Sequence, residues 1–309
     1  MALVLAGVTA LDLAYNNGPS TSSALPPQTY DALQPNTRNA TVLALKSRLA
    51  ESKAADATGA RRDRIELMGL GFHWPNVSLS HALDNTLGYN PIRLLDYSLA
   101  TGAGDTVGLP DQRKFSPLFP SYKSPLADIL GLRYIAAGQP LEWHDKALKT
   151  GDLKLLAKSE DGWLYENPRA LPRVIMAGQA WGGGSFADMM KTGLWPEGFD
   201  PSRTVLLEGT SKIVFTALGA ISTFEPTARI VSYRNTEVVI EAKSPRGGWL
   251  VLNDPWHPWW YAEVDGKLAP ILKANVIMRA VELPPGTKTV RFHFRPLHGA
   301  LDQLRAKWR

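Results

Sequence analysis

The chain has 309 residues, of which 44% are hydrophobic and 20% charged, and this balance excludes wholesale disorder and a polytopic membrane protein within these residues. It contains no cysteine, which excludes disulfides, thiolate metal sites and a cysteine nucleophile. The formal net charge is +5, and the basic residues are scattered apart from the runs 61–64 and 305–309, so a nucleic-acid partner is only weakly indicated; an anionic membrane surface or a phosphate-bearing lipid would suit this charge equally well.

The first half of the chain alternates predicted strands and helices. Residues 2–14 are almost wholly apolar, lack the basic start of a signal peptide and are shorter than the roughly 20 residues of a membrane helix. They are therefore predicted as a buried strand or as the stub of a longer hydrophobic segment. Further patterns predict a helix over 41–52, a strand over 64–70, a helix over 126–130 and a strand over 132–136. This alternation is typical of an α/β layer.

Strand patterns dominate the second half. Two strands are predicted over 153–158 and 162–166, a third over 173–176, and a short helix over 186–191. Six short strands follow, over 228–233, 237–242, 248–252, 261–264, 275–281 and 289–294, which is typical of a β-sandwich. The sequence therefore predicts an α+β protein with an α/β domain over 1–170, a connecting strand and helix region over 171–225, and an antiparallel β-sandwich domain over 226–309.

The segment 248–267 is the most distinctive part of the chain, because it holds four of the ten tryptophans. Two strand-like runs and the dipeptide Asp265-Gly266, which suits a tight turn, indicate the edge of a β-hairpin with an aromatic face. Such rings pack in cores and interfaces or stack on sugar rings. Packing is the commoner use, and sugar stacking stays open.

No strong catalytic signature is present: the chain has no Walker loop, no dinucleotide fingerprint, no HExxH and no GxSxG motif. The six histidines show no i, i+4 pair, so neither a metal nor a cofactor is predicted. Asp254 with Glu263 is one carboxylate pair that a glycoside hydrolase could use, but sequence does not set the separation that such chemistry needs. Asp96 is more simply an ion-pair partner of Arg93 within one helical turn.

Several segments together resemble those of a known protein family. The segments are 88–91 (Gly-Tyr-Asn-Pro), 128–134, 167–173, 200–208, 250–266, 270–275 and 281–287. In this order they resemble the extracytoplasmic C-terminal region of the YfhO-type bacterial membrane proteins, which look like C-type glycosyltransferases with lipid-linked sugar donors. The resemblance covers most of the chain. It departs at His257, Trp259 and Trp260, where the family tends to have tyrosines and a glycine.

The resemblance implies a non-catalytic extracytoplasmic module that helps a membrane glycosyltransferase to position a glycan or lipid-phosphate acceptor. The catalytic carboxylate would lie between membrane helices that this chain lacks, so no catalytic residue is predicted here, and the apolar start favours an excised region over a stand-alone relative. The implied partners are a membrane-embedded transferase domain of the same polypeptide and a glycan or lipid-linked sugar, at the extracytoplasmic face of the bacterial inner membrane. The alternatives are a free-standing carbohydrate-binding protein and, less favoured, a glycoside hydrolase. The candidate ligand-binding residues are Asn253, Asp254, Trp256, His257, Trp259, Trp260, Tyr89, Asn90 and Arg93.

Overall fold

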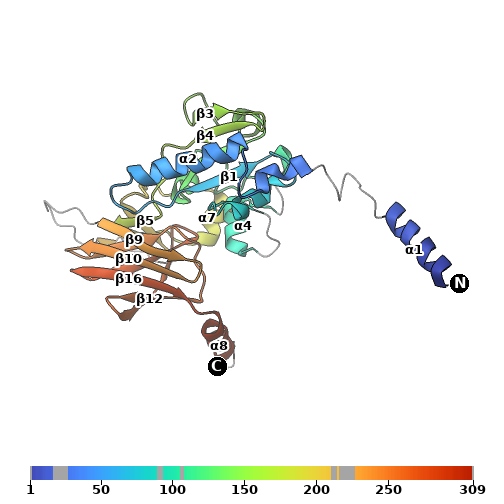
Figure 1. Cartoon of the computed structure of the whole chain (residues 1–309). Coiled ribbons are helices and arrows are strands. Elements are labelled where there is room, and N and C mark those ends of the chain that lie inside the picture. The colour runs from blue at the N-terminus through green and yellow to red at the C-terminus, as the bar shows by residue number, and fades with distance from the viewer. Residues whose placement is uncertain are drawn as a thin grey trace.

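The computed structural model describes residues 2–16, 27–88, 93–104, 108–209, 214–215 and 227–307. It contains a four-stranded sheet near one end, a five-stranded sheet near the other and a seven-stranded sheet (Figure 1). Most of the helices belong to the first two thirds of the chain, and strands dominate the last third. The predicted mixed α+β class is therefore confirmed.

The four-stranded sheet has the order β1 (Arg64–Met68), β2 (Leu132–Ala137), β4 (Trp163–Glu166), β3 (Lys154–Lys158). Strands β1 and β2 are parallel, and the other pairs are antiparallel. All four strands were predicted from their apolar patterns. The helices α2 (Ala40–Ala55) and α5 (Pro125–Ile129) are also confirmed. Asn39 begins α2 by accepting a hydrogen bond from the Val42 backbone N–H at 3.0 Å.

The remaining helical elements are short, apart from the two terminal ones. They are α1 (Ala2–Asn16), η1 (Pro27–Leu33), η2 (Trp74–Asn76), α3 (Val77–Ser80), α4 (Leu95–Thr101), η3 (Pro110–Gln112), α6 (Leu141–His144), α7 (Phe186–Thr192) and α8 (Pro296–Lys307). The helix α7 was predicted, and Ser185 caps it by accepting from the Asp188 backbone N–H at 3.2 Å.

The seven-stranded sheet joins strands that are far apart in the sequence. Its order is β5 (Val174–Ala177), β11 (Gly248–Leu252), β15 (Met278–Leu283), β14 (Leu272–Ala274), β7 (Thr204–Leu207), β6 (Gln179–Gly182), β8 (Val214–Phe215). The strand predicted over 275–281 begins only at Met278, because Asn275 and Val276 have left-handed φ angles of 46° and 73°. Strands from the predicted connecting region 171–225 pair directly with strands that follow residue 226. The division into domains stays a prediction.

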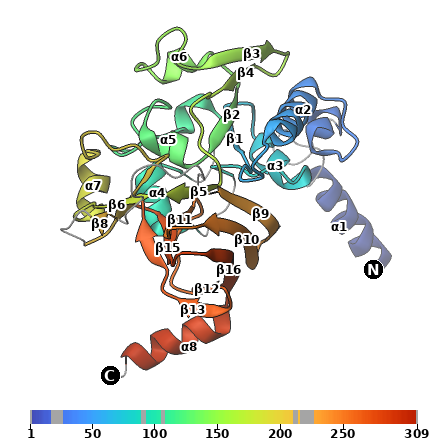
Figure 2. The same ribbon diagram turned by 90° about the vertical axis from the view of Figure 1, so that its left-hand side faces the viewer.

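The five-stranded sheet is antiparallel throughout, in the order β13 (Lys267–Ala269), β12 (Trp260–Val264), β16 (Thr287–Phe294), β10 (Glu237–Ser244), β9 (Thr227–Arg234). Figure 2 shows β11 and β15 beside β9, β10 and β16. Leu250 and Val281 of the seven-stranded sheet share one buried cluster with Ile240 and Phe292 of the five-stranded sheet. Burial of such side chains contributes roughly 1.5–3 kcal/mol each.

The hairpin expected over 248–267 is only partly correct. The dipeptide Asp265-Gly266 does form a tight turn, with φ angles of 49° and 77°, as Asp-Gly suits. However, the turn joins β12 to β13, and β11 lies in the other sheet. The loop with Pro255 and Pro258 carries the chain from one sheet to the other. Strand β11 ends before this loop, since proline cannot donate a ladder hydrogen bond.

The apolar start was predicted as a buried strand or as the stub of a longer hydrophobic segment. The first alternative is wrong, because residues 2–16 form the helix α1 and none of them is buried. Leu3, Leu5 and Leu11 are 89%, 68% and 73% exposed. Among the described helices, none is both long and apolar enough to cross a membrane.

Candidate functional site

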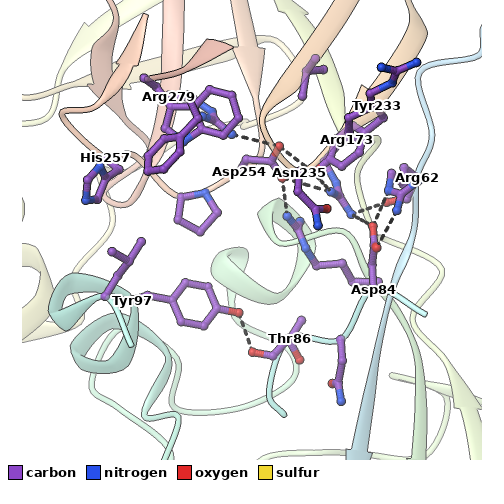
Figure 3. Close-up of a pocket in the computed structure, with 18 of the residues that line it drawn as sticks. Arg62, Asp84, Thr86, Tyr97, Arg173, Tyr233, Asn235, Asp254, His257 and Arg279 are labelled. Carbon is purple, nitrogen blue, oxygen red and sulfur yellow. Dashed lines mark hydrogen bonds and ion pairs between the residues drawn. The ribbon is translucent and has the colours of Figure 1, made fainter. Parts of the chain in front are cut away.

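A cavity of about 730 Å³ lies between residues 62–97 of the first half of the chain and the strands and loops of the second half. Figure 3 shows Thr86 and Tyr97 on one side and Asp254 and Arg279 on the other. Clefts between structural units are common positions of ligand sites. The charged and aromatic residues that line it are Arg62, Arg64, Arg93, Arg173, Arg234, Arg279, Asp84, Asp254, Tyr97, Tyr233, His257, Trp260 and Phe294.

Asp254 is the centre of the buried wall of this cavity. Its Oδ1 accepts from Arg64 Nη2 at 2.7 Å and from Arg173 Nη1 at 3.0 Å. Its Oδ2 accepts from the Tyr233 hydroxyl at 2.8 Å and from Arg279 Nη2 at 3.2 Å. Arg64 opens β1, Arg173 precedes β5, Arg279 lies on β15 and Tyr233 on β9, so this one carboxylate ties together all three sheets.

Three guanidinium groups set the ionisation of Asp254. Burial by itself raises the pKa of this carboxyl, but the positive charges of Arg173, Arg64 and Arg279 outweigh that effect and hold the pKa well below its usual range. Asp254 is therefore ionised at neutral pH, and its charge holds the three guanidinium groups in position. A general acid needs the opposite, a raised pKa.

Asp84 is the second anion of the site. Arg62 binds both of its carboxylate oxygens, at 2.6 and 2.8 Å, and Arg173 Nη2 donates to it at 2.9 Å. Arg173 thus bridges Asp84 and Asp254. The Arg62 guanidinium also lies over the Tyr233 ring, 4.3 Å from its centroid. These contacts fix the position of Arg62, whose side chain is 40% exposed.

Trp260 supports an arginine. The Arg279 guanidinium lies over the Trp260 ring at 3.9 Å from the centroid, a distance at which the ring attracts the cation. Arg279 is 3% exposed, and its Nε and Nη1 have no hydrogen-bond partner among the residues described. Burial lowers the pKa of Arg279, against the attraction of Asp254. One face of Trp260 is therefore already covered by a cation.

The cavity has a strong excess of positive charge. Six arginines line it against two aspartates, a formal excess of four charges with histidine neutral. Arg234 is exposed at the rim and forms no ion pair within the described ranges. Tyr97 is neutral, because burial raises its pKa to about 12, and its hydroxyl donates to the Thr86 carbonyl at 2.6 Å. The planar guanidinium matches carboxylate and phosphate groups, so the cavity is suited to anions.

Four of the nine candidate residues from the sequence line this cavity, namely Asp254, His257, Trp260 and Arg93. Arg93 donates to the Gly88 carbonyl at 2.7 Å. Burial and then Arg279 lower the pKa of His257, which favours its neutral form. Tyr89 and Asn90 lie outside the described residues.

The other three candidates do not line the cavity. Asn253 is fully buried and donates from Nδ2 to the Pro172 carbonyl at 2.9 Å. Trp259 packs edge-on against His257, with 4.8 Å between the ring centroids. Trp256 is half-buried, and its backbone N–H donates to Ile277 at 2.7 Å. The contacts of Asn253 and Trp259 are those of packing residues.

Sequence reasoning missed most of the charged residues of the site. Arg62 and Arg64 belong to the one conspicuous basic run of the first half. Arg279 is a charged residue within an apolar strand, and since a buried charge needs a partner, this pattern could have indicated a charged site. The predicted partner of Asp96 is also corrected: its carboxylate pairs with Lys273 Nζ at 2.7 Å. Within the described chain, no group of three or more metal-ligating side chains is close enough to hold an ion.

The chain matches no family model, no curated protein and no solved structure. The likeness to the YfhO-type proteins therefore stays a prediction from the motifs.

The lowered pKa of Asp254 predicts a pH dependence of stability. A carboxyl with a folded-state pKa below its unfolded value, about 3.9, stabilises the fold fully above that value and loses this contribution as the pH falls further. The free energy of unfolding should therefore exceed that of the D254N variant by a constant amount from pH 7 to about 5. The difference should narrow below about pH 4. Urea unfolding of both proteins over this range measures it, and a difference that stays constant down to pH 3 would contradict it.

Proposed function

We propose that the chain is a non-catalytic extracytoplasmic module of a membrane glycosyltransferase that uses lipid-linked sugar donors. In this role the arginine-lined cavity holds the anionic part of a glycan or a lipid-phosphate acceptor. The single observation that carries the proposal is the charge of the cavity, six arginines against two aspartates. Carboxylate and phosphate groups are the anions that such an array binds best.

The finer architecture belongs to the same proposal. The five-stranded sheet and strands β11 and β15 would form the predicted β-sandwich, with β5 of the connecting region paired to β11. The core that Leu252, Val290 and Phe292 share across the two sheets supports this arrangement, since inward-facing side chains of both sheets build such a core. The sandwich would supply a rigid wall for the cavity, from which Arg279, Trp260 and Asp254 project.

The membrane location rests on α1 and on the resemblance. The helix carries apolar side chains on all sides, including Leu3, Leu5 and Leu11, and buries none of them. A helix that is hydrophobic all round suits a lipid environment or a continuing membrane segment. The proposed partner is therefore a membrane-embedded transferase domain of the same polypeptide, at the extracytoplasmic face.

Arg234→Gln tests the anion site directly, because this side chain is exposed at the rim and forms no ion pair in the described structure. We expect the variant to fold normally and to bind pyrophosphate and galacturonate about five- to tenfold more weakly, the effect of one charged hydrogen bond. Lys267→Gln removes the same charge from an exposed position at the start of β13, outside the cavity, and should leave binding unchanged. Isothermal titration calorimetry at constant ionic strength measures both variants.

The alternative of a free-standing carbohydrate-binding protein makes a different prediction for the same experiment. If neutral oligosaccharides bound as tightly as the anions and R234Q had no effect, the anion-binding role would be wrong and this alternative would gain. The glycoside hydrolase alternative finds no support at Asp254, because both of its carboxylate oxygens are already occupied by arginines and by Tyr233.

A further inference from the structure

A second cavity, of about 720 Å³, lies beside the first. It is lined by one side of α2 and by β9. The two cavities share Arg62, Leu83, Asp84 and Tyr233. The Arg62–Asp84 ion pair, with Tyr233 against it, is therefore a wall common to both cavities, and the partly exposed Arg62 side chain lies between them.

The second cavity is lined by two lysines that form no ion pair within the described residues. Lys46 and Lys53 lie seven residues apart on α2, which places them two turns apart on one side of the helix. Both are exposed, and neither forms an ion pair within the described residues. In contrast, Arg61 is paired with Asp63 at 2.9 Å, and Arg229 is paired with Glu241. The two lysines are the cations still available to a ligand.

These observations place cations without an ion pair in two adjoining cavities: Arg234 in the first and Lys46 and Lys53 in the second. A small anion occupies only one of the two cavities. A linear chain with repeated charges contacts both cavities at once, and the second contact then forms at a high effective concentration.

We propose that the second cavity is a further subsite for the ligand of the first, and that this ligand is a linear anionic glycan with charged groups on at least two of its sugar units. This inference rests on the proposed function and names its substrate class. The carboxylate of a uronic acid and the phosphate of a phosphorylated sugar are the two forms of charge that both sets of cations accept.

The aromatic residues argue for a glycan over a single-stranded nucleic acid. Bases bind single-strand sites by stacking on free aromatic faces. Here one face of the Tyr233 ring is covered by Arg62 at 4.3 Å, and one face of the Trp260 ring by Arg279 at 3.9 Å. The polar side chains Asn85, Asn235 and Ser232 line the two cavities and suit sugar hydroxyl groups.

The test compares a short and a long probe of the same chemistry, galacturonate and its linear hexamer, by calorimetry on the whole chain. We expect the hexamer to bind at least about tenfold more tightly than the monomer. Substitution of both lysines, Lys46→Gln with Lys53→Gln, should weaken hexamer binding by about fivefold or more and leave monomer binding unchanged. The matched control is Lys146→Gln with Lys149→Gln, which removes two exposed charges outside both cavities and should change neither.

Each other outcome is decisive. Equal affinities for monomer and hexamer, or a hexamer affinity that the two lysines do not affect, would overturn the second subsite and leave the anion site of the first cavity in place. Failure of both probes and of a phosphorylated oligosaccharide to bind would overturn the proposed function and this inference together. Tighter binding of a thymidine oligonucleotide of equal charge, with the same dependence on Lys46 and Lys53, would overturn the glycan as ligand.

Discussion

Replacing Asp254 with asparagine is expected to lower the free energy of unfolding by about 3–5 kcal/mol, the usual cost of breaking a buried ion pair from one side. Asp254 is 4% exposed and forms ion pairs with Arg64, Arg173 and Arg279, of which the last two are 2% and 3% exposed. Asparagine keeps the size of the side chain but removes the charge, so three guanidinium groups would repel one another in a site of low dielectric. Equilibrium unfolding in urea at pH 7 measures the loss.

The control for this variant is Asp111→Asn, which makes the same chemical change at an exposed position. We expect it to stay within about 0.5 kcal/mol of the unaltered protein. A D254N protein that unfolds within about 1 kcal/mol of the unaltered protein would show that the arginines relax into solvent, and that Asp254 does not organise the cavity.

The local part of the fold could be predicted because it follows from local patterns. Apolar spacing identified α2 and the strands β1, β2, β10 and β16, and Asp265-Gly266 was correctly read as a turn. The pairing of strands could not be predicted in the same way. Strand β5 pairs with β11 about 70 residues later, and the apolar pattern of each strand does not indicate which other strand it pairs with. The chain also changes sheet between β11 and β12, where we expected a hairpin.

The candidate site shows the same limit at the level of side chains. Asp254 was one of the candidates and lines the cavity, but its partner Arg64 lies 190 residues earlier, a relation that only the assembled sheets create. The tryptophans were expected to offer an aromatic face to a ligand or to pack. The structure places Trp259 in packing contacts and uses Trp260 to support Arg279, so the rings hold the cations in position. A charge inside an apolar strand, as at Arg279, was the more informative signal.

A second large effect is expected behind the cavity, at the buried pair of Glu66 and Arg113. Glu66 Oε1 accepts from Arg113 Nε at 2.7 Å and from the Tyr122 hydroxyl at 2.6 Å, and Oε2 accepts from Thr86 Oγ1 at 2.7 Å. Glu66 and Arg113 are 0% and 2% exposed. We expect Glu66→Leu and Arg113→Met each to lower the free energy of unfolding by about 3–5 kcal/mol, because each leaves one buried charge without its partner.

The double variant separates this cause from simple loss of packing. With both charges removed, the two apolar side chains fill similar volumes, and no buried ion remains to be compensated. The double variant should therefore be no less stable than the less stable of the two single variants, which corresponds to a coupling of at least about 3 kcal/mol in urea unfolding. Additive losses would instead mean that each side chain acts through its other contacts, Arg113 through the Phe115 and Phe119 rings and Glu66 through Thr86. Thr86 donates to Glu66 and also lines the cavity. Coupling of the expected size would therefore mean that the Glu66–Arg113 pair holds this polar part of the cavity lining in position.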